Sequence, residues 1–224
     1  ISPDASADGR LRPLLTSREG DVAPRPPPRD GRTTVHHMSV SRVPFRLRPP
    51  DLPPELLHRP RLLDALRQRF EQRLVVLRAG AGFGKTTALA HALAENVLDS
   101  LGTDAWLQLS EHDRQTDHLV AGLVDALTAA GCGPSEPILD PCLADVVDLV
   151  WARAPEPIAL VLDDAHVLDG SPAAAFLVDL CRDLPGNGHL VIGSRTAPMV
   201  PLRLLQARGQ ALELTEDDLA FTTP

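Results

Sequence analysis

Two hydrophobic periods alternate along the chain from residue 59 onward. Apolar positions spaced three and four residues apart indicate amphipathic helices, whereas short, largely apolar runs indicate buried strands. The helical period predicts helices over 59–70, 85–98, 117–130, 142–152, a segment that starts after Ser171, and 201–209. The short apolar runs between them predict strands over 74–79, 105–109, 157–164, 189–195 and 211–214.

This alternation of strands and helices predicts the fold class. Strands that alternate with helices favour an α/β fold, in which a parallel five-stranded sheet carries helices on both faces. We expect residues 55–215 to form this domain. Residues 216–224 are expected to begin a following domain, because Thr215 caps a short acidic turn and threonines before Pro224 are typical of a helix start.

Neither period is found in residues 1–50, which contain proline-rich stretches such as APRPPPRDGR at 23–32. Such segments bury too little apolar surface to fold, so this Pro/Arg-rich tail is expected to be a disordered extension. The first methionine is Met38. We therefore interpret residues 1–37 as a leader without structure or as sequence upstream of the true start.

Charge and cysteine content narrow the function classes. The net charge is −8, with ten arginines against seven acidic residues in 1–60 and twelve basic against 23 acidic residues in 61–224. An acidic body with 3% aromatic residues argues against direct nucleic-acid binding by this segment. The basic tail could hold an anion loosely, although such tails are more often simply solvated. No apolar run could cross a membrane, and three distant cysteines without metal-ligand spacing predict reduced thiols and a cytoplasmic location.

Only one lysine, Lys85, is present among the 22 basic residues. Residues 79–86, AGAGFGKT, fit the phosphate-binding pattern G-x-x-x-x-G-K-[ST] except for alanine at the first position. Glycines let backbone N–H groups turn toward phosphate oxygens, and the helix that follows adds its positive end. A strand before the motif and a helix after it favour this interpretation over a glycine turn with an incidental lysine. The expected nucleotide-binding residues are Ala79, Gly80, Ala81, Gly82, Phe83, Gly84, Lys85, Thr86 and Thr87.

Each of these groups has an expected role. The Lys85 ammonium would reach the β- and γ-phosphates, and the Thr86 hydroxyl would bind Mg²⁺. ALVLDD at 159–164 delivers two carboxylates to the carboxyl end of a strand expected to neighbour the loop's own strand. Asp163 would hold Mg²⁺ through water and Asp164 would orient the attacking water, although an Asp pair after a strand can also be a cap or a turn.

Arg195, at the end of the fourth predicted strand, is a candidate sensor of the γ-phosphate. The alternative is a surface arginine that happens to follow a strand. His112 and His166 are interpreted as structural or solvent-facing residues. No His, Cys, Asp or Glu spacing indicates zinc.

Five segments, taken in order, resemble the N-terminal ATPase domain of the large LuxR-type transcriptional regulators, the MalT-like group of signal-transduction ATPases. They are LLHRPRLLDAL, RAGAGFGKTTALA, DAWLQLS, ALVLDDAHVL and HLVIGSRTAPMVPLRLLQARGQALELTEDDLAFT, which together cover about residues 55–223. The resemblance implies an AAA+/STAND-like P-loop NTPase that uses ATP or ADP with Mg²⁺. It places Arg59 near adenine and supports Arg195 as the sensor. The family usually has proline where this loop has Gly80.

In that family, a winged helix, a helical-repeat sensor and a DNA-binding helix-turn-helix follow the ATPase domain. None of them is found in this sequence, so DNA binding is not expected of this segment. The function expected is an ATP-binding, slowly hydrolysing switch of a LuxR-type regulator, with ATP as partner and ATP-dependent self-association as a further candidate interaction. Two alternatives stay open: a nucleotide sensor without turnover, and the ATPase module of another multidomain signalling protein.

Overall fold

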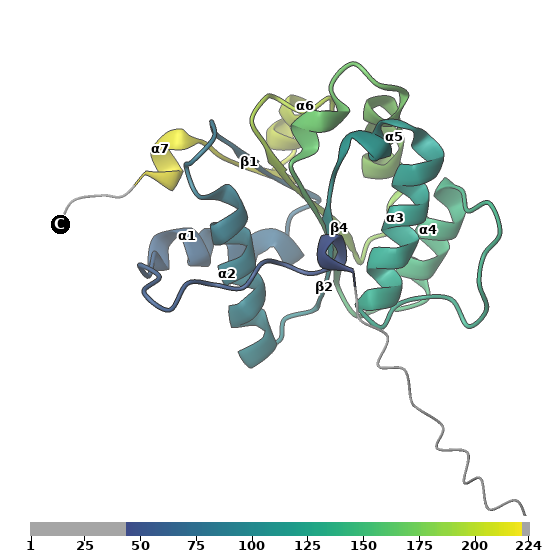
Figure 1. The fold of residues 1–224 in the computed structure, drawn as a ribbon, viewed down its shortest axis with the longest axis horizontal. Helices are drawn as coiled ribbons and strands as arrows, with labels where there is room; N and C mark the ends of the chain where they lie inside the picture. The colour runs from purple at the N-terminus through teal and green to yellow at the C-terminus, as the bar shows by residue number, and fades with distance from the viewer. Residues whose placement is uncertain (1–43, 221–224) are drawn as a thin grey trace, which may run out of the picture. The chain divides into compact units, whose positions relative to one another are not determined.

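A single parallel sheet organises residues 44–220, which are the residues described in the computed structural model of this protein (Figure 1). Its neighbouring strands run in the order β2-β3-β4-β1-β5, and every neighbouring pair is parallel. The α/β class predicted from the alternating periods is therefore confirmed. The strands are β1 Leu74–Arg78, β2 Thr103–Gln108, β3 Ile158–Asp163, β4 Gly188–Ser194 and β5 Ala211–Leu214.

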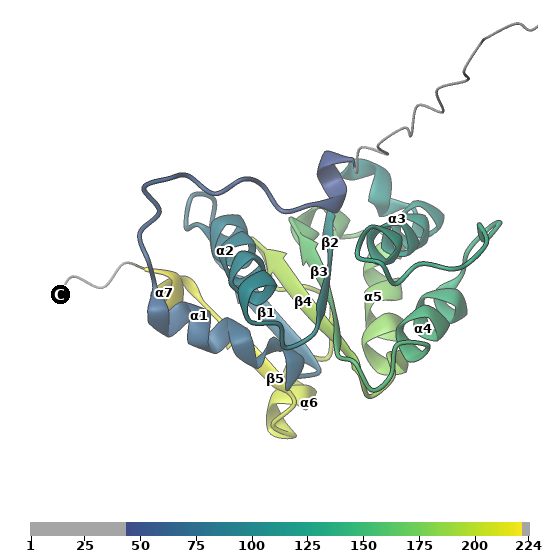
Figure 2. The same ribbon diagram turned by 90° about the horizontal axis from the view of Figure 1, so that it is seen from below.

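Helices cover both faces of this sheet (Figure 2). Successive side chains of a strand point to opposite faces, and β1 shows the consequence. Leu74 and Val76 join one apolar cluster, while Val75 and Leu77 join the other. Because each face is covered, the central strands β1, β3 and β4 are apolar at most positions, as the sequence pattern predicts.

The two clusters draw on different helices. One contains the buried sides of α3, α4 and α5, and the other contains those of α1, α2 and α7. In the described part of the chain, no helix combines the length and apolar character needed to cross a bilayer. The helices are α1 Pro60–Arg67, α2 Lys85–Leu98, α3 Thr116–Ala129, α4 Leu143–Trp151, α5 Pro172–Asp183, α6 Leu202–Ala207 and α7 Glu216–Leu219.

Short 3-10 helices fill several of the connections. They are η1 Phe45–Leu47, η2 Gln68–Phe70, η3 Glu111–Arg114 and η4 Ala165–Leu168.

The carboxyl ends of β1, β3 and β4 meet at one edge of the sheet. Arg78 pairs with Ser194, and the amide of Ala79 donates to the Ser194 carbonyl at 3.2 Å. β4 lies between β1 and β3, so the expectation that the strand ending in Asp163 neighbours the loop's own strand is wrong. After β1 the chain crosses to the far edge and returns through β3 to β4, which places this loop where the strand order reverses.

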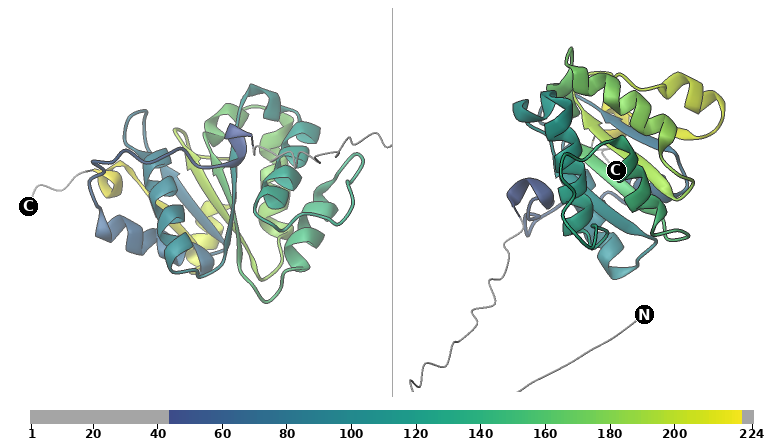
Figure 3. Two further views of the ribbon diagram at one scale, coloured as in Figure 1. Left: turned by 60° about the horizontal axis from the view of Figure 1, so that its bottom comes forward. Right: turned by 90° about the vertical axis from the view of Figure 1, so that its right-hand side faces the viewer.

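Residues on both sides of the expected range 55–215 contact the α/β body. Arg46, inside the predicted tail, donates to the carboxylate of the buried Asp113 at 2.6 Å, so the ordered body begins before residue 55. Figure 3 shows the segment between η1 and α1 running past α2 toward α7. Leu219, predicted to belong to a following domain, is buried in the α1–α2 cluster. The expectations for residues 1–43 and 221–224 lie outside the described residues.

Candidate functional site

The loop between β1 and α2, residues 79–84, has the backbone shape that its glycines predict. Gly82 and Gly84 have φ angles of 83° and 76°, a left-handed conformation that glycine adopts without steric cost. The turn leads directly into α2, whose first amides lack acceptors within the helix. A helix N-terminus behind a glycine loop is a binding site for an anion such as phosphate.

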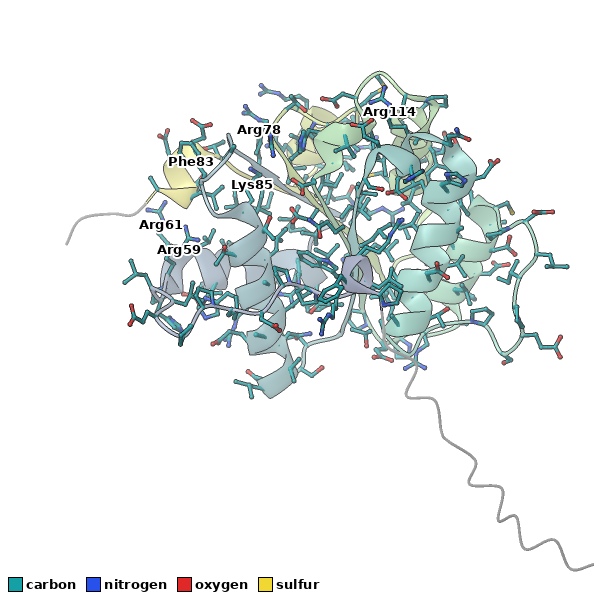
Figure 4. All side chains as sticks on the ribbon, viewed as in Figure 1. Arg59, Arg61, Arg78, Phe83, Lys85 and Arg114 are labelled. Atoms are coloured by element: carbon teal, nitrogen blue, oxygen red, sulfur yellow. The ribbon has the colours of Figure 1, made fainter. Side chains whose placement is uncertain are left out.

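Lys85 lies inside this loop (Figure 4). Its ammonium donates to the carbonyls of Ala79 at 2.7 Å and Gly80 at 2.8 Å, and only 7% of the residue is exposed. Burial lowers the pKa of Lys85, and the negative charge of Asp163 opposes that shift. The ammonium is therefore held in the loop by two neutral carbonyl oxygens, which phosphate oxygens could replace as acceptors.

Thr86, the second residue of α2, contacts Asp163, the last residue of β3. The Thr86 hydroxyl donates to Asp163 Oδ2 at 2.6 Å, although 77 positions separate the two residues in the sequence. Asp163 is fully buried, and its other oxygen, Oδ1, has no hydrogen-bond partner in the structure. Burial raises the pKa of Asp163, while the Thr86 bond opposes this shift. A buried carboxylate oxygen without a partner beside a hydroxyl is suited to a hydrated cation.

Gly193 on β4 makes room for that carboxylate. A Cβ atom at this position would lie 2.7 Å from Asp163 Oδ1, which is too close for any side chain. The strand that separates β1 from β3 therefore uses glycine where the aspartate reaches across it.

Asp164 occupies a different environment from Asp163. It adopts a left-handed φ of 59° at the start of η4, yet its side chain makes no cap hydrogen bond there. Its carboxylate lies 3.4 Å from Gln108 Nε2 and 3.8 Å from His166 Nδ1, and its side chain is 30% exposed. Because the side chain makes no cap hydrogen bond, helix capping does not account for Asp164 at this position.

Arg195 follows β4 on the same rim and is exposed. Burial is the main cause of the lowered pKa of Lys85, and the positive charge of Arg195 adds to it. A cavity of about 210 Å³ opens between the end of β1 and the start of α7. It is lined by Arg78, Ala79, Arg195, Thr215, Glu216 and Asp217.

Arg59 connects the segment before α1 to the loop and to α7. Its guanidinium donates to the carbonyls of Leu219 at 2.8 Å and Gly84 at 3.5 Å. Burial lowers the pKa of Arg59. A second cavity of about 160 Å³ lies beside it. Its lining residues are His58, Arg59, Pro60, Arg61, Leu62, Asp218 and Ala220.

Glu216 is a residue of the site that the sequence pattern does not reveal. Its carboxylate accepts a hydrogen bond from the amide of Gly80 at 2.8 Å, and its charge acts on the pKa of Lys85. A proline at position 80 would have no N–H to donate. Glycine in place of the proline expected from the family resemblance was therefore a signal in the sequence that this contact is possible.

Comparisons with known proteins identify relatives of the chain by sequence. No protein-family model matches the chain. The HTH-type transcriptional regulator MalT of Yersinia pestis is 30% identical over 189 residues, and MalT of Klebsiella pneumoniae is 31% identical over 193 residues. The chain is homologous to the N-terminal region of MalT. Each alignment covers 80% of this chain and 20% of the MalT relative, so the chain spans about a fifth of the length of these proteins.

The solved structures that match this chain have lower sequence identity to it than the MalT relatives do. Cdc6p from Pyrobaculum aerophilum has a TM-score of 0.47 at 16% identity and covers 74% of this chain and 47% of that one. A Walker-type ATPase of Pyrococcus abyssi also has a TM-score of 0.47, at 15% identity, and covers 77% of this chain and 57% of that one. Both TM-scores are below 0.5, and the fold is defined by the order and pairing of the strands in the sheet.

Proposed function

We propose that residues 44–220 form an ATP-binding and slowly hydrolysing switch domain of a LuxR-type regulator. The observation that carries this proposal is the contact between Thr86 at the end of the glycine loop and the buried Asp163 at the end of β3. A hydroxyl and a carboxylate meeting beside a phosphate loop form the arrangement in which P-loop NTPases hold Mg²⁺ against the β- and γ-phosphates.

The phosphates would lie at the start of α2. Backbone amides of the loop and of the first helical turn would donate to their oxygens, and Lys85 would turn from the carbonyls of Ala79 and Gly80 to the β- and γ-phosphates. This exchange replaces two neutral acceptors with charged ones, so each hydrogen bond becomes stronger.

The residues at this position fit Mg²⁺. Thr86 would supply its hydroxyl, and the partnerless Oδ1 of Asp163 would accept from a water of the ion's shell. When bound, Mg²⁺ would neutralise phosphate charge during transfer of the terminal phosphoryl group. The buried carboxylate would need that charge, because an isolated ionised group in an apolar interior is unfavourable.

The remaining groups would act on the terminal phosphate and the base. Asp164, less buried than Asp163, would orient the attacking water, and Arg195 would respond to the γ-phosphate from the rim. Arg59 would lie beside the adenine, next to the smaller of the two cavities. In a longer protein, we propose that α7 carries the phosphate state onward, because its Glu216 contacts the loop directly.

Calorimetric titration tests the binding part of this proposal. We expect the chain to bind ATP and ADP in the presence of Mg²⁺ and to bind AMP much more weakly, because AMP lacks the phosphates that the loop would contact. Chelation of Mg²⁺ should weaken ATP binding. Equal affinity for AMP and ATP would contradict the assignment of the loop to the β- and γ-phosphates.

Asp164→Asn should leave the affinity for MgATP within about twofold and lower the hydrolysis rate at least about tenfold, since a positioned base contributes 10² or more to such steps. Asp117→Asn, at an exposed position on α3, is the control for loss of one surface carboxylate and should retain full turnover. Phosphate release under single-turnover conditions is the measurement. Normal turnover in Asp164→Asn would reject the role of Asp164. Absence of turnover in the unchanged protein would favour the sensor alternative.

Glu216→Gln should raise the affinity for MgATP about fivefold, because removal of a negative charge near the phosphate site lowers electrostatic repulsion by roughly 1 kcal/mol. Gly80→Pro removes the amide that holds the carboxylate and should act in the same direction. Asp217→Asn, at the exposed neighbouring position, should have a smaller effect. Titration of the three variants with MgATP tests the idea, and unchanged or weaker binding by Glu216→Gln would disprove it.

A further inference from the structure

Three side chains with metal-binding atoms converge on the outer surface of α2, away from Thr86 and Asp163. His91 and Glu95 are four positions apart on α2 and therefore share one face of that helix. His58 comes from the segment that precedes α1. Their ligand atoms all lie within 4.8 Å of one another, and no other group of three His, Cys, Asp or Glu residues among the described residues meets this criterion.

The distances within this cluster are those of atoms arranged around a shared centre. Nε2 of His58 lies 3.7 Å from Glu95 Oε1, and Nε2 of His91 lies 3.8 Å from the same oxygen. Both separations exceed the length of a hydrogen bond. Around a tetrahedral zinc ion with bonds of about 2.0–2.1 Å, neighbouring ligand atoms are about 3.4 Å apart. Shifts of a few tenths of an ångström would bring each imidazole nitrogen to that distance from Glu95 Oε1, and the two nitrogens, which lie within 4.8 Å of each other, would move closer together.

We propose that His58, His91 and Glu95 form a binding site for a divalent transition-metal ion of the zinc type. Two imidazoles and one carboxylate are ligands that such ions prefer, whereas Mg²⁺ prefers oxygen ligands alone. Three protein ligands leave a fourth position open for water or another small donor. The site is distinct from the nucleotide site and does not depend on the function proposed for it.

His91 is the most enclosed of the three ligands, with only 13% of its side chain exposed, against 31% for Glu95 and 61% for His58. The two rings are 4.9 Å apart and perpendicular, so one does not stack over the other.

Two arginines also lie near the cluster. Arg67 Nη2 is 3.8 Å from Glu95 Oε2, the oxygen that does not face the histidines, and so leaves Oε1 available. A bound metal would fix His58 against α2, and Arg59, the next residue, contacts Gly84 and Leu219. Metal binding would therefore order the segment that enters α1 beside the loop.

The test uses untagged protein in which His36 and His37 are replaced by Asn, so that this adjacent pair of imidazoles does not bind the metal. Titration with Co²⁺ followed by visible absorption, and with Zn²⁺ by calorimetry, should each give one equivalent of binding. His58→Ala, His91→Ala and Glu95→Gln should each weaken binding at least about tenfold. Zn²⁺ should also raise the melting temperature, and His58→Ala should abolish that shift.

The matched control is His118→Ala. His118 also lies near a second histidine, His112, at a ring separation of 6.2 Å, but no carboxylate completes a cluster there. Its affinity for Co²⁺ should equal that of the reference protein. Since 61% of the His58 side chain is exposed, its replacement is not expected to unfold the domain. Equal metal affinity in His58→Ala and the reference, thiolate absorption that indicates cysteine ligands, or no binding at saturating metal would each overturn the proposal.

Discussion

Lys85→Ala should lower the affinity for MgATP at least about 100-fold while leaving the domain folded. Charge-assisted hydrogen bonds contribute roughly 1.5–3 kcal/mol each, and two such bonds to phosphate oxygens account for this factor. Lys85 belongs to neither apolar cluster, and its ammonium contacts only loop carbonyls, so its removal leaves the core packing intact. Titration calorimetry measures the affinity, and circular dichroism on the same sample monitors the fold.

Two further variants test whether the shape or only the charge of the Lys85 side chain matters: one replaces Lys85 itself, and the other removes a positive charge elsewhere. Lys85→Arg keeps the positive charge, but the planar guanidinium does not fit where a compact ammonium reaches two carbonyls of the loop, so binding should also be lost. Arg208→Ala removes one cation from an exposed position and should bind MgATP normally. Affinity within a few-fold of the reference in Lys85→Ala would show that the nucleotide site has been misplaced.

Asp104→Ala should destabilise the domain by about 3–5 kcal/mol, because it leaves a buried guanidinium without its counter-ion. Arg69, which is 1% exposed, donates to both carboxylate oxygens of Asp104, at 2.8 Å and 2.7 Å. Asn96 donates to the same carboxylate at 2.8 Å. The pair joins the end of η2 to the start of β2, so its loss also removes a link between the two segments. Urea unfolding followed by circular dichroism measures the change.

An exposed ion pair with the same geometry provides the control. Arg182 also contacts both carboxylate oxygens of its neighbour Asp183, at 2.8 Å and 3.1 Å, but both side chains are exposed. Asp183→Ala should leave the unfolding midpoint almost unchanged, since water and salt screen such pairs. If the two substitutions had equal effects, burial would not be the cause of the stability assigned to the Arg69–Asp104 pair.

Local structure could be predicted closely from the sequence. The helix Lys85–Leu98 and the strand Ala211–Leu214 have the predicted bounds, and the ends of the other strands differ from the predicted ones by at most two residues. The helix predicted to end at residue 70 instead ends at Arg67 and continues as η2. Such ends depend on capping and on neighbouring elements, whereas hydrophobic period is set by side chains a few positions apart.

Some residues of the candidate site can also be predicted from the sequence, whereas others depend on the tertiary structure. Residues 79–87 are consecutive, so their shared role can be proposed from the motif alone, and Asp163 can be proposed because it ends an apolar strand. The order of the strands cannot be obtained by such reasoning, and β4 was not expected between β1 and β3. The need for glycine at position 193 becomes clear only from the strand order, because the Asp163 carboxylate that it accommodates comes from the adjacent strand β3.

Contacts between residues far apart in sequence were missed. Glu216 lies 136 positions after Gly80, and His58 lies 33 positions before His91. Neither contact can therefore be predicted from a short sequence motif. For the same reason, the sequence spacing gave no indication of a zinc site, although three ligand atoms converge on α2. The first contact depends on the position of α7 beside the loop, and the histidine cluster depends on the packing of α1 against α2.

By itself, the sequence determined the kinds and order of the elements, the glycine loop with its lysine, and the strand that carries the acidic pair. These features depend on period, backbone freedom and side-chain chemistry within about ten residues, which a single chain displays directly. Only the tertiary structure decided the strand order, the Glu216 contact, the buried Arg69–Asp104 pair and the histidine cluster. These features depend on which helices and strands pack against one another, and the packing brings together residues that are far apart in the sequence. Burial then determines how strong each polar contact is.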